Sequence, residues 1–246
     1  MSLRHHEIAE ARHRILNPFT EAKLRLLGST CGVGPESRIL DLACGKGEML
    51  ALWASWFGSG GVGVDLSLVF LSAARERFVE LGVADRVDVI AGDAGSYVPE
   101  AGGFDVAACI GATWIGGGLG GTLALLRPAV KPGGLVLVGE PYLVDAPPPE
   151  AFEAWGFPAD EYTTLAGTAE RIAAAGFELA EMVLADGDSW DRYEAAHWPT
   201  ILDWLAANPS DEDAPAMREF LDRERSAYLR FGRRHLGWGV FVCRPA

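Results

Sequence analysis

Short apolar runs alternate with helical stretches along most of this sequence. Five runs have the pattern of buried strands: 38–42, 62–65, 87–91, 104–110 and 135–139. Three stretches between or beside them have helical periodicity: 48–57, 68–81 and 119–126. Strands that alternate with helices at this spacing form βαβ units, whose parallel sheet is covered on both faces. The alternation therefore predicts a doubly wound α/β fold.

The two ends of the chain extend this pattern. Near the N-terminus we expect helices at 8–16 and 19–27. After the fifth strand we expect a stiff Pro-rich loop at residues 147–149. A helix at 168–175 and strands at 177–184 and 238–244 follow the central region. Between those last strands lie only helical patterns, at 190–207 and 215–232. The sequence thus predicts seven strands and additional helices outside the sheet.

Composition excludes several classes of partner. The 246 residues carry a formal net charge of −13, which repels phosphate backbones, so we expect no nucleic-acid partner. The four cysteines form no CxxC pair and have no histidine at ligand spacing, which predicts reduced thiols, a cytoplasmic location and no metal. The uncharged segment 106–126 contains six glycines, which break it into shorter elements, so we expect no membrane span.

The segment ILDLACGKGEML, residues 39–50, is the part of the sequence that indicates which ligand the chain binds. A buried strand reaches Asp41, Gly45 and Gly47 bracket a tight turn, and a helix follows. A Walker phosphate loop is excluded because Gly47 follows Lys46, and the dinucleotide fingerprint lacks its third glycine, since Leu50 stands there. An acid just ahead of the glycines opposes a pyrophosphate and favours a cationic ligand such as S-adenosylmethionine.

Two further acids follow the next strands. Asp65 ends the second strand, where a carboxylate accepts hydrogen bonds from ribose hydroxyls, and Asp93 follows the third, where one accepts from an adenine amino group. The carboxyl ends of parallel strands form the edge at which open α/β sheets bind ligands. A turn or helix cap would explain either acid alone, but not the ordered set.

On these residues the chain resembles class I S-adenosylmethionine-dependent methyltransferases. The matching pieces run in family order from Ile39 to Tyr142: DLACGKG, GVGVDLS, AGDA, FDVAACIGATW and LRPAVKPGGLVLVGEPY. The whole chain, with WDRYEAAHWPTILDWL and HLGWGVFV, resembles a small bacterial branch of that family. The resemblance implies the cofactor and leaves the acceptor open.

The resemblance also implies an architecture. It is a doubly wound, mostly parallel, seven-stranded Rossmann-like sheet with an antiparallel last strand and a helical cap. We expect residues 1–33 to form an N-terminal helical cap, residues 34–187 and 235–246 to form the α/β core that binds S-adenosylmethionine, and residues 188–234 to form a helical insertion over the acceptor site.

The family motifs imply which residues bind the cofactor: Asp41, Ala43, Cys44, Gly45, Gly47, Asp65, Leu66, Asp93, Ala94 and Ile110. The first five lie at the methionine end, and the Ile110 backbone faces the methionine amino group. Asp65 holds the ribose, Leu66 packs on the adenine, and Asp93 with Ala94 reads the adenine edge. Ala43 stands where the family usually has glycine. Alanine is tolerated there if the backbone stays at negative φ, which is what we expect.

The acceptor side has several candidates. The acceptor pocket candidates are Asn17, Trp114, Tyr142, Trp190, Tyr193, His197 and Trp198, and the catalytic candidates are His197, Glu140 and Tyr142. Trp190, Tyr193 and His197 share a helix face, which fits an aromatic lid with a basic histidine or an ordinary packed helix. Glu140 fits a base-orienting or acceptor-binding role, or a strand-end cap. For the N-terminal histidines and arginines we expect a solvated helix face.

The predicted function is methyl transfer from S-adenosylmethionine to a small-molecule acceptor, leaving S-adenosylhomocysteine. The sulfonium is already activated, so alignment and exclusion of water in a lidded pocket carry the reaction. Two alternatives remain: a protein or RNA methyltransferase, and a non-catalytic S-adenosylmethionine-binding module. The sequence leaves the oligomeric state open.

Overall fold

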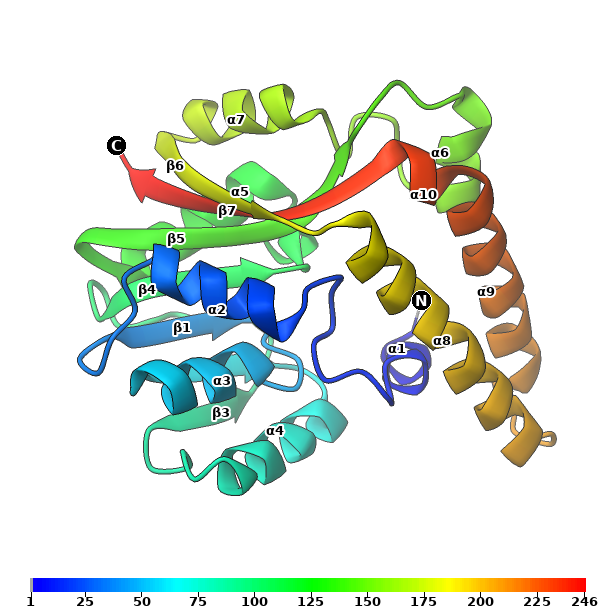
Figure 1. The fold of residues 1–246 in the computed structure, drawn as a ribbon, viewed down its shortest axis with the longest axis horizontal. Coiled ribbons are helices and arrows are strands. Elements are labelled where there is room, and N and C mark those ends of the chain that lie inside the picture. The colour runs from blue at the N-terminus through cyan, green and yellow to red at the C-terminus, as the bar shows by residue number, and fades with distance from the viewer. Residues whose placement is uncertain (1) are drawn as a thin grey trace.

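One seven-stranded sheet organises the computed structural model, which describes residues 2–246 (Figure 1). Its strands are β1 (Arg38–Leu42), β2 (Gly60–Asp65), β3 (Val87–Ala91), β4 (Phe104–Ile110), β5 (Val130–Leu143), β6 (Phe177–Leu184) and β7 (Leu236–Pro245). Their order is β3-β2-β1-β4-β5-β7-β6. The pairs from β3 to β5 are parallel, and β7 runs antiparallel to both β5 and β6. The predicted doubly wound, Rossmann-like sheet with an antiparallel last strand is therefore confirmed.

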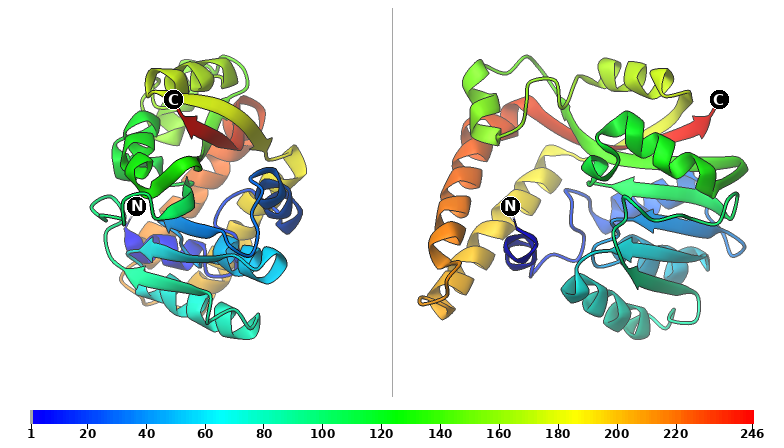
Figure 2. Two further views of the ribbon diagram at one scale, coloured as in Figure 1. Left: turned by 90° about the vertical axis from the view of Figure 1, so that its left-hand side faces the viewer. Right: turned by 180° about the vertical axis from the view of Figure 1, so that it is seen from behind.

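Helices cover both faces of this sheet (Figure 2). The helices are α1 (Leu3–Ala9), α2 (Glu21–Thr30), α3 (Glu48–Phe57), α4 (Leu68–Glu80), α5 (Leu119–Leu126), α6 (Pro149–Trp155), α7 (Leu165–Ala174), α8 (Gly187–Ala207), α9 (Ala214–Ala227) and α10 (Arg233–His235), with short 3₁₀ segments at Thr113–Gly116 and Arg127–Ala129 and a π-helical turn at Tyr228–Gly232. Trp53 and Phe78 anchor the core under α2, α3 and α4, whereas Leu123 and Ile172 anchor the opposite core under α5 and α7.

A separate helical layer stands beyond the carboxyl ends of the parallel strands (Figure 1). It combines α1 from the N-terminus with α8 and α9. These helices share their own apolar core: Ile8, Ala9, Ile201, Leu205, Ala214, Met217 and Leu221. This layer faces the edge at which ligands bind in open α/β sheets. Within the described residues, no helix is both long and apolar enough to cross a membrane.

Two local predictions were wrong. The helix expected at 8–16 is α1, which ends at Ala9, and irregular turns follow it. The physical reason is Lys46. Its ammonium group donates hydrogen bonds to main-chain carbonyls of this segment, which in a continuing helix would accept hydrogen bonds from N–H groups of the next turn. The Pro-rich stretch at 147–149 ends in a helix, because Pro149 occupies the first turn of α6, where its missing N–H costs nothing.

Candidate active site

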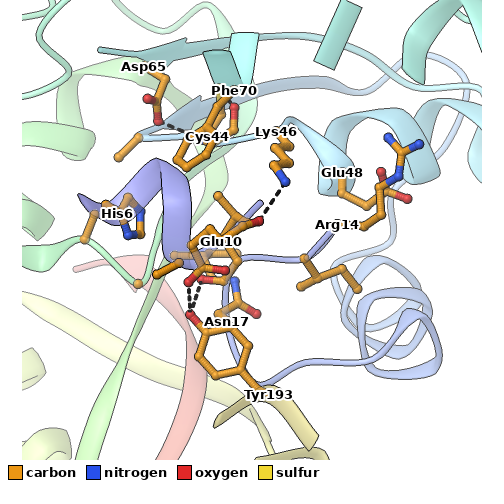
Figure 3. Close-up of a pocket in the computed structure, with 18 of the residues that line it drawn as sticks. His6, Glu10, Arg14, Asn17, Cys44, Lys46, Glu48, Asp65, Phe70 and Tyr193 are labelled. Atoms are coloured by element: carbon orange, nitrogen blue, oxygen red, sulfur yellow. Dashed lines mark hydrogen bonds between the residues drawn. The ribbon is translucent and has the colours of Figure 1, made fainter. Parts of the chain in front are cut away.

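A cavity of about 450 Å³ lies between the carboxyl ends of the strands and the helical layer (Figure 3). Its lining contains all but one of the residues expected to bind the cofactor: Asp41, Ala43, Cys44, Gly45, Asp65, Leu66, Asp93, Ala94 and Ile110. Gly47 is outside the lining. It has a φ of 63° and forms the N-terminal cap of α3, so its contribution is to the turn itself.

Asp41 is a buried carboxyl group that faces this cavity. Only 5% of the residue is exposed, and its carboxylate receives no hydrogen bond from residues 2–246. Burial, together with the nearby charge of Asp65, raises the pKa of Asp41 to about 8. A buried carboxyl group beside a second acid and without a counter-ion is stabilised either by a proton or by a bound cation. The site therefore has the charge that a sulfonium or ammonium group requires.

Asp65 ties the glycine turn to the start of α4. Its Oδ2 accepts a hydrogen bond from the Gly45 N–H at 2.8 Å, and its Oδ1 accepts from the Ser67 N–H at 2.9 Å. The Ser67 hydroxyl in turn donates to Glu7 of α1 at 2.6 Å. These bonds fix the carboxylate in the cavity wall while leaving it lone pairs for a ligand.

Ala43 corrects one expectation directly. Its backbone has a φ of 58°, in the left-handed region rather than at negative φ. An L-residue there costs about 1–2 kcal/mol relative to glycine, partly offset by the greater freedom of glycine in the unfolded chain. The turn between β1 and α3 imposes this conformation despite the cost.

Ala43→Gly is therefore expected to raise the free energy of unfolding by about 0.5–1 kcal/mol, measured by urea denaturation of the ligand-free protein. Ala206→Gly, on the exposed surface of α8, is the matched control. There the same replacement should destabilise by about 1 kcal/mol, because glycine is a poor helix former. Destabilisation in both variants would contradict strain at Ala43.

Glu10 is the centre of a buried polar cluster that sequence analysis missed. Its Oε1 accepts from the Tyr193 hydroxyl at 2.6 Å and pairs with His197 Nε2 at 3.0 Å, and its Oε2 lies 3.1 Å from His13 Nδ1 (Figure 3). Burial alone would raise the pKa of Glu10, but its pairing with the two histidines outweighs burial and holds the pKa well below the ordinary value. Burial would lower the pKa of His197, yet the pairing with Glu10 raises it.

Possible metal-ligating atoms of Glu10, His13 and His197 also lie within 4.8 Å of one another. The sequence led us to expect no metal. Because Glu10 Oε1 already pairs with both Tyr193 and His197, we interpret the group as an ion-paired network.

Lys46 holds the segment after α1 over the cavity. Its Nζ donates to the main-chain carbonyls of Glu10 at 2.8 Å, Ala11 at 3.0 Å and His13 at 2.7 Å. The lysine of the glycine turn thus binds protein rather than ligand. The expected solvated face is wrong for His13, which joins the Glu10 cluster, and for His6, which lines the cavity.

The expected acceptor residues fall into three groups. Five of them line the main cavity: Asn17, Trp114, Tyr193, His197 and Trp198. Trp190 and Glu140 instead line a second cavity of about 210 Å³ beside it. Tyr142 lines neither, because β5 continues through it and its buried ring packs on Gly237 of β7. Its assignment to the acceptor pocket is corrected accordingly.

Comparison with known proteins matches this architecture. Residues 39–134 match a family model described as a methyltransferase domain. The uncharacterized protein YjhP of Escherichia coli (strain K12) is 46% identical over 237 residues, which cover 96% of this chain and 95% of YjhP.

Two solved structures extend the match to the fold. They are S-adenosylmethionine-dependent methyltransferases crystallised with S-adenosyl-L-homocysteine. The Geobacter sulfurreducens protein has 45% identity and a TM-score of 0.95, and the Thiobacillus denitrificans protein has 43% identity and a TM-score of 0.94. Each alignment covers 100% of this chain and 99% of the other. The chain therefore belongs to the S-adenosylmethionine-dependent methyltransferase family.

Proposed function

We propose that this enzyme transfers the methyl group of S-adenosylmethionine to a small organic acceptor, in a pocket covered by the segment after α1 and by α8. The observation that carries the proposal is the cavity itself. Its floor holds the buried Asp41 and the partly exposed Asp65, and its opposite wall holds Tyr193 and His197. A concave space of about 450 Å³ suits a small acceptor better than a macromolecular surface.

The cofactor residues divide by the chemistry they offer. Asp41, with Ala43, Cys44, Gly45 and Gly47, forms the end that would receive the cationic methionine part, beside the Ile110 backbone. Asp65 would accept from the ribose hydroxyls. Leu66, with 59% of its surface exposed, offers an apolar face for the adenine, whose edge Asp93 and Ala94 would read. The crystallisation of two similar enzymes with S-adenosyl-L-homocysteine supports the choice of cofactor.

The helical layer supplies alignment and exclusion of water. We propose that residues 2–19 and 188–234 act together as the cap. The expected N-terminal cap of residues 1–33 is too long, because α2 packs on the sheet and belongs with the binding core of residues 34–187 and 235–246. The Glu10 cluster joins the two cap segments, since Tyr193 and His197 come from α8. With its pKa raised by Glu10, His197 is better suited to orient groups as a charged donor than to accept a proton.

A macromolecular acceptor is the second candidate, and the charge of −13 disfavours RNA. The four cysteines are all free, which supports our proposal of a cytoplasmic enzyme.

Methyl-labelled S-adenosylmethionine and a bacterial extract test the proposed function. After incubation, products are separated by size, with Asp65→Ala as the inactive control and the exposed Asp85→Ala as its matched surface control. We expect label in the small-molecule fraction, retained with Asp85→Ala and lost with Asp65→Ala. Label confined to macromolecules would overturn the small-molecule acceptor. Tight S-adenosylmethionine binding with no label in any fraction would favour the binding module.

A further inference from the structure

The second cavity adjoins the main one and shares part of its wall. Asn17, Gly111, Trp114, Tyr193 and Glu194 line both. Because the same residues line both cavities, a molecule held in the second cavity would lie beside the expected methyl-donor site. We call this second cavity the side chamber.

Aromatic side chains supply five of the fourteen residues that line the side chamber. They are three tryptophans and two tyrosines: Trp114, Trp190, Trp238, Tyr162 and Tyr193. Aromatic faces carry negative electrostatic potential and attract cations. Among the described residues that line the chamber there is no lysine, arginine or histidine. The chamber therefore contains no cationic side chain that would pair with an anionic acceptor.

Two carboxyl groups complete the chamber. Glu140 is only 3% exposed, and its Oε2 accepts from the Thr113 hydroxyl at 3.0 Å. Its Oε1 receives no hydrogen bond from any residue in the described part of the chain. Glu194 Oε1 accepts from the Trp190 indole N–H at 3.1 Å. Asn17 Oδ1 is also buried without a partner. The chamber thus offers acceptors that a ligand rich in N–H donors would satisfy.

From this arrangement, which rests on the proposed function, we propose that the methyl acceptor is a small amine held in the side chamber, with Glu140 as the group that binds and deprotonates its nitrogen. The aromatic walls and the carboxylates recognise the ammonium form. An ammonium N–H gives its proton to the Glu140 carboxylate, and the freed lone pair attacks the methyl carbon. The N–C bond forms as the C–S bond breaks, and its electron pair stays on sulfur. The products are an N-methylammonium ion and neutral S-adenosylhomocysteine, so charge and atoms balance.

Glu140 has the acidity this role needs. Burial raises its pKa to about 7, so the group exchanges protons near neutral pH. Arg171 opposes this shift and Glu161 adds to it. Tyr162 and Cys109 face Glu140, and the pKa of each is raised so that both stay neutral. Glu194 adds a second carboxyl group to the lining of the same chamber.

The first test uses deuteromethyl S-adenosylmethionine, the full-length enzyme and a metabolite extract, with products analysed by mass spectrometry after cation exchange. We expect a small basic product that carries the label on nitrogen. Labelled small molecules without a basic nitrogen would overturn the amine inference and leave the proposed function intact. Label found only in macromolecules would overturn the proposed function itself.

The second test does not depend on knowing the acceptor. The enzyme saturated with S-adenosylhomocysteine is titrated calorimetrically with 2-(dimethylamino)ethanol, which is cationic near pH 7 and carries one N–H, and with its neutral carbon isostere, 3-methylbutan-1-ol. A desolvated cation–π site should favour the cation about 10-fold or more. Equal binding of the two probes, or binding of neither, would overturn the amine site.

Glu140→Gln keeps the shape and the bond from Thr113 but removes the charge. We expect it to lower kcat/KM for the identified amine about 100-fold, to weaken the binding of 2-(dimethylamino)ethanol, and to leave S-adenosylmethionine affinity unchanged. In the parent enzyme kcat/KM should rise with pH through about 7, since the ionised Glu140 is the active form, and this rise should vanish in the variant. Glu178→Gln, exposed on β6, is the matched control. An unaltered pH profile in Glu140→Gln would exclude Glu140 as the base.

Discussion

Asp65→Ala is expected to weaken S-adenosylmethionine binding about 100-fold or more in an equilibrium titration. Hydrogen bonds to a charged group contribute about 1.5–3 kcal/mol each, and the ribose would present two hydroxyls to this carboxylate. The replacement also releases the Gly45 N–H, which Asp65 now holds at 2.8 Å, so the turn beside the methionine end loosens.

Two further variants separate these effects. Asp65→Asn keeps one carbonyl oxygen for the Gly45 N–H and should retain the fold, with a smaller loss of affinity. Asp85→Ala removes an exposed aspartate from the turn before β3 and should bind normally. Unchanged affinity in Asp65→Ala, with the fold intact by circular dichroism, would place the cofactor elsewhere.

Glu10→Ala is expected to lower the free energy of unfolding by about 3 kcal/mol near pH 6. Removing one member of a buried ion pair leaves the other charge unpaired, which typically costs about 3–5 kcal/mol. Tyr193 and His197 would both lose their partner, and the bridge between the two cap segments would open. We therefore expect an increased KM for the acceptor as well. Urea denaturation and steady-state kinetics measure the two effects.

The contribution of the Glu10 cluster to the free energy of unfolding depends on pH. The pKa of Glu10 is lowered by folding, so its stabilisation is present above its unfolded pKa and is lost as pH falls toward the folded value. The pKa of His197 is raised, so its stabilisation is present below its unfolded pKa and is lost as pH rises through the folded value. The gap between the parent protein and Glu10→Ala should therefore narrow at high pH.

Glu76→Ala, on the exposed face of α4, controls for loss of a glutamate and should change stability little at any pH. If Glu10→Ala is as stable as this control at pH 6, the Glu10 cluster does not join the cap segments.

Most of the sheet and its cofactor edge could be predicted from sequence because their signals are local. Helix α3 and strands β3, β4 and β6 begin and end where periodicity placed them. Periodicity works there because each strand or helix must bury one face or stripe against the sheet. Asp41, Asp65 and Asp93 lie at or just beyond the carboxyl ends of β1, β2 and β3, and topology alone brings such positions to one edge.

Tertiary structure decided what depends on contacts between distant segments. Glu10 and His197 are separated by 187 positions, and nothing in the local pattern of either indicates that they pair. The positive φ of Ala43 comes from the geometry of the turn, which the residue type opposes. The side chamber forms where the segments that carry Glu140, Tyr162 and Trp190 pack together. These segments are distant in the sequence, and the pattern of no single segment predicts how they pack. Sequence thus determined the fold and the donor edge, and only long-range packing determined the cap and the shape of the acceptor site.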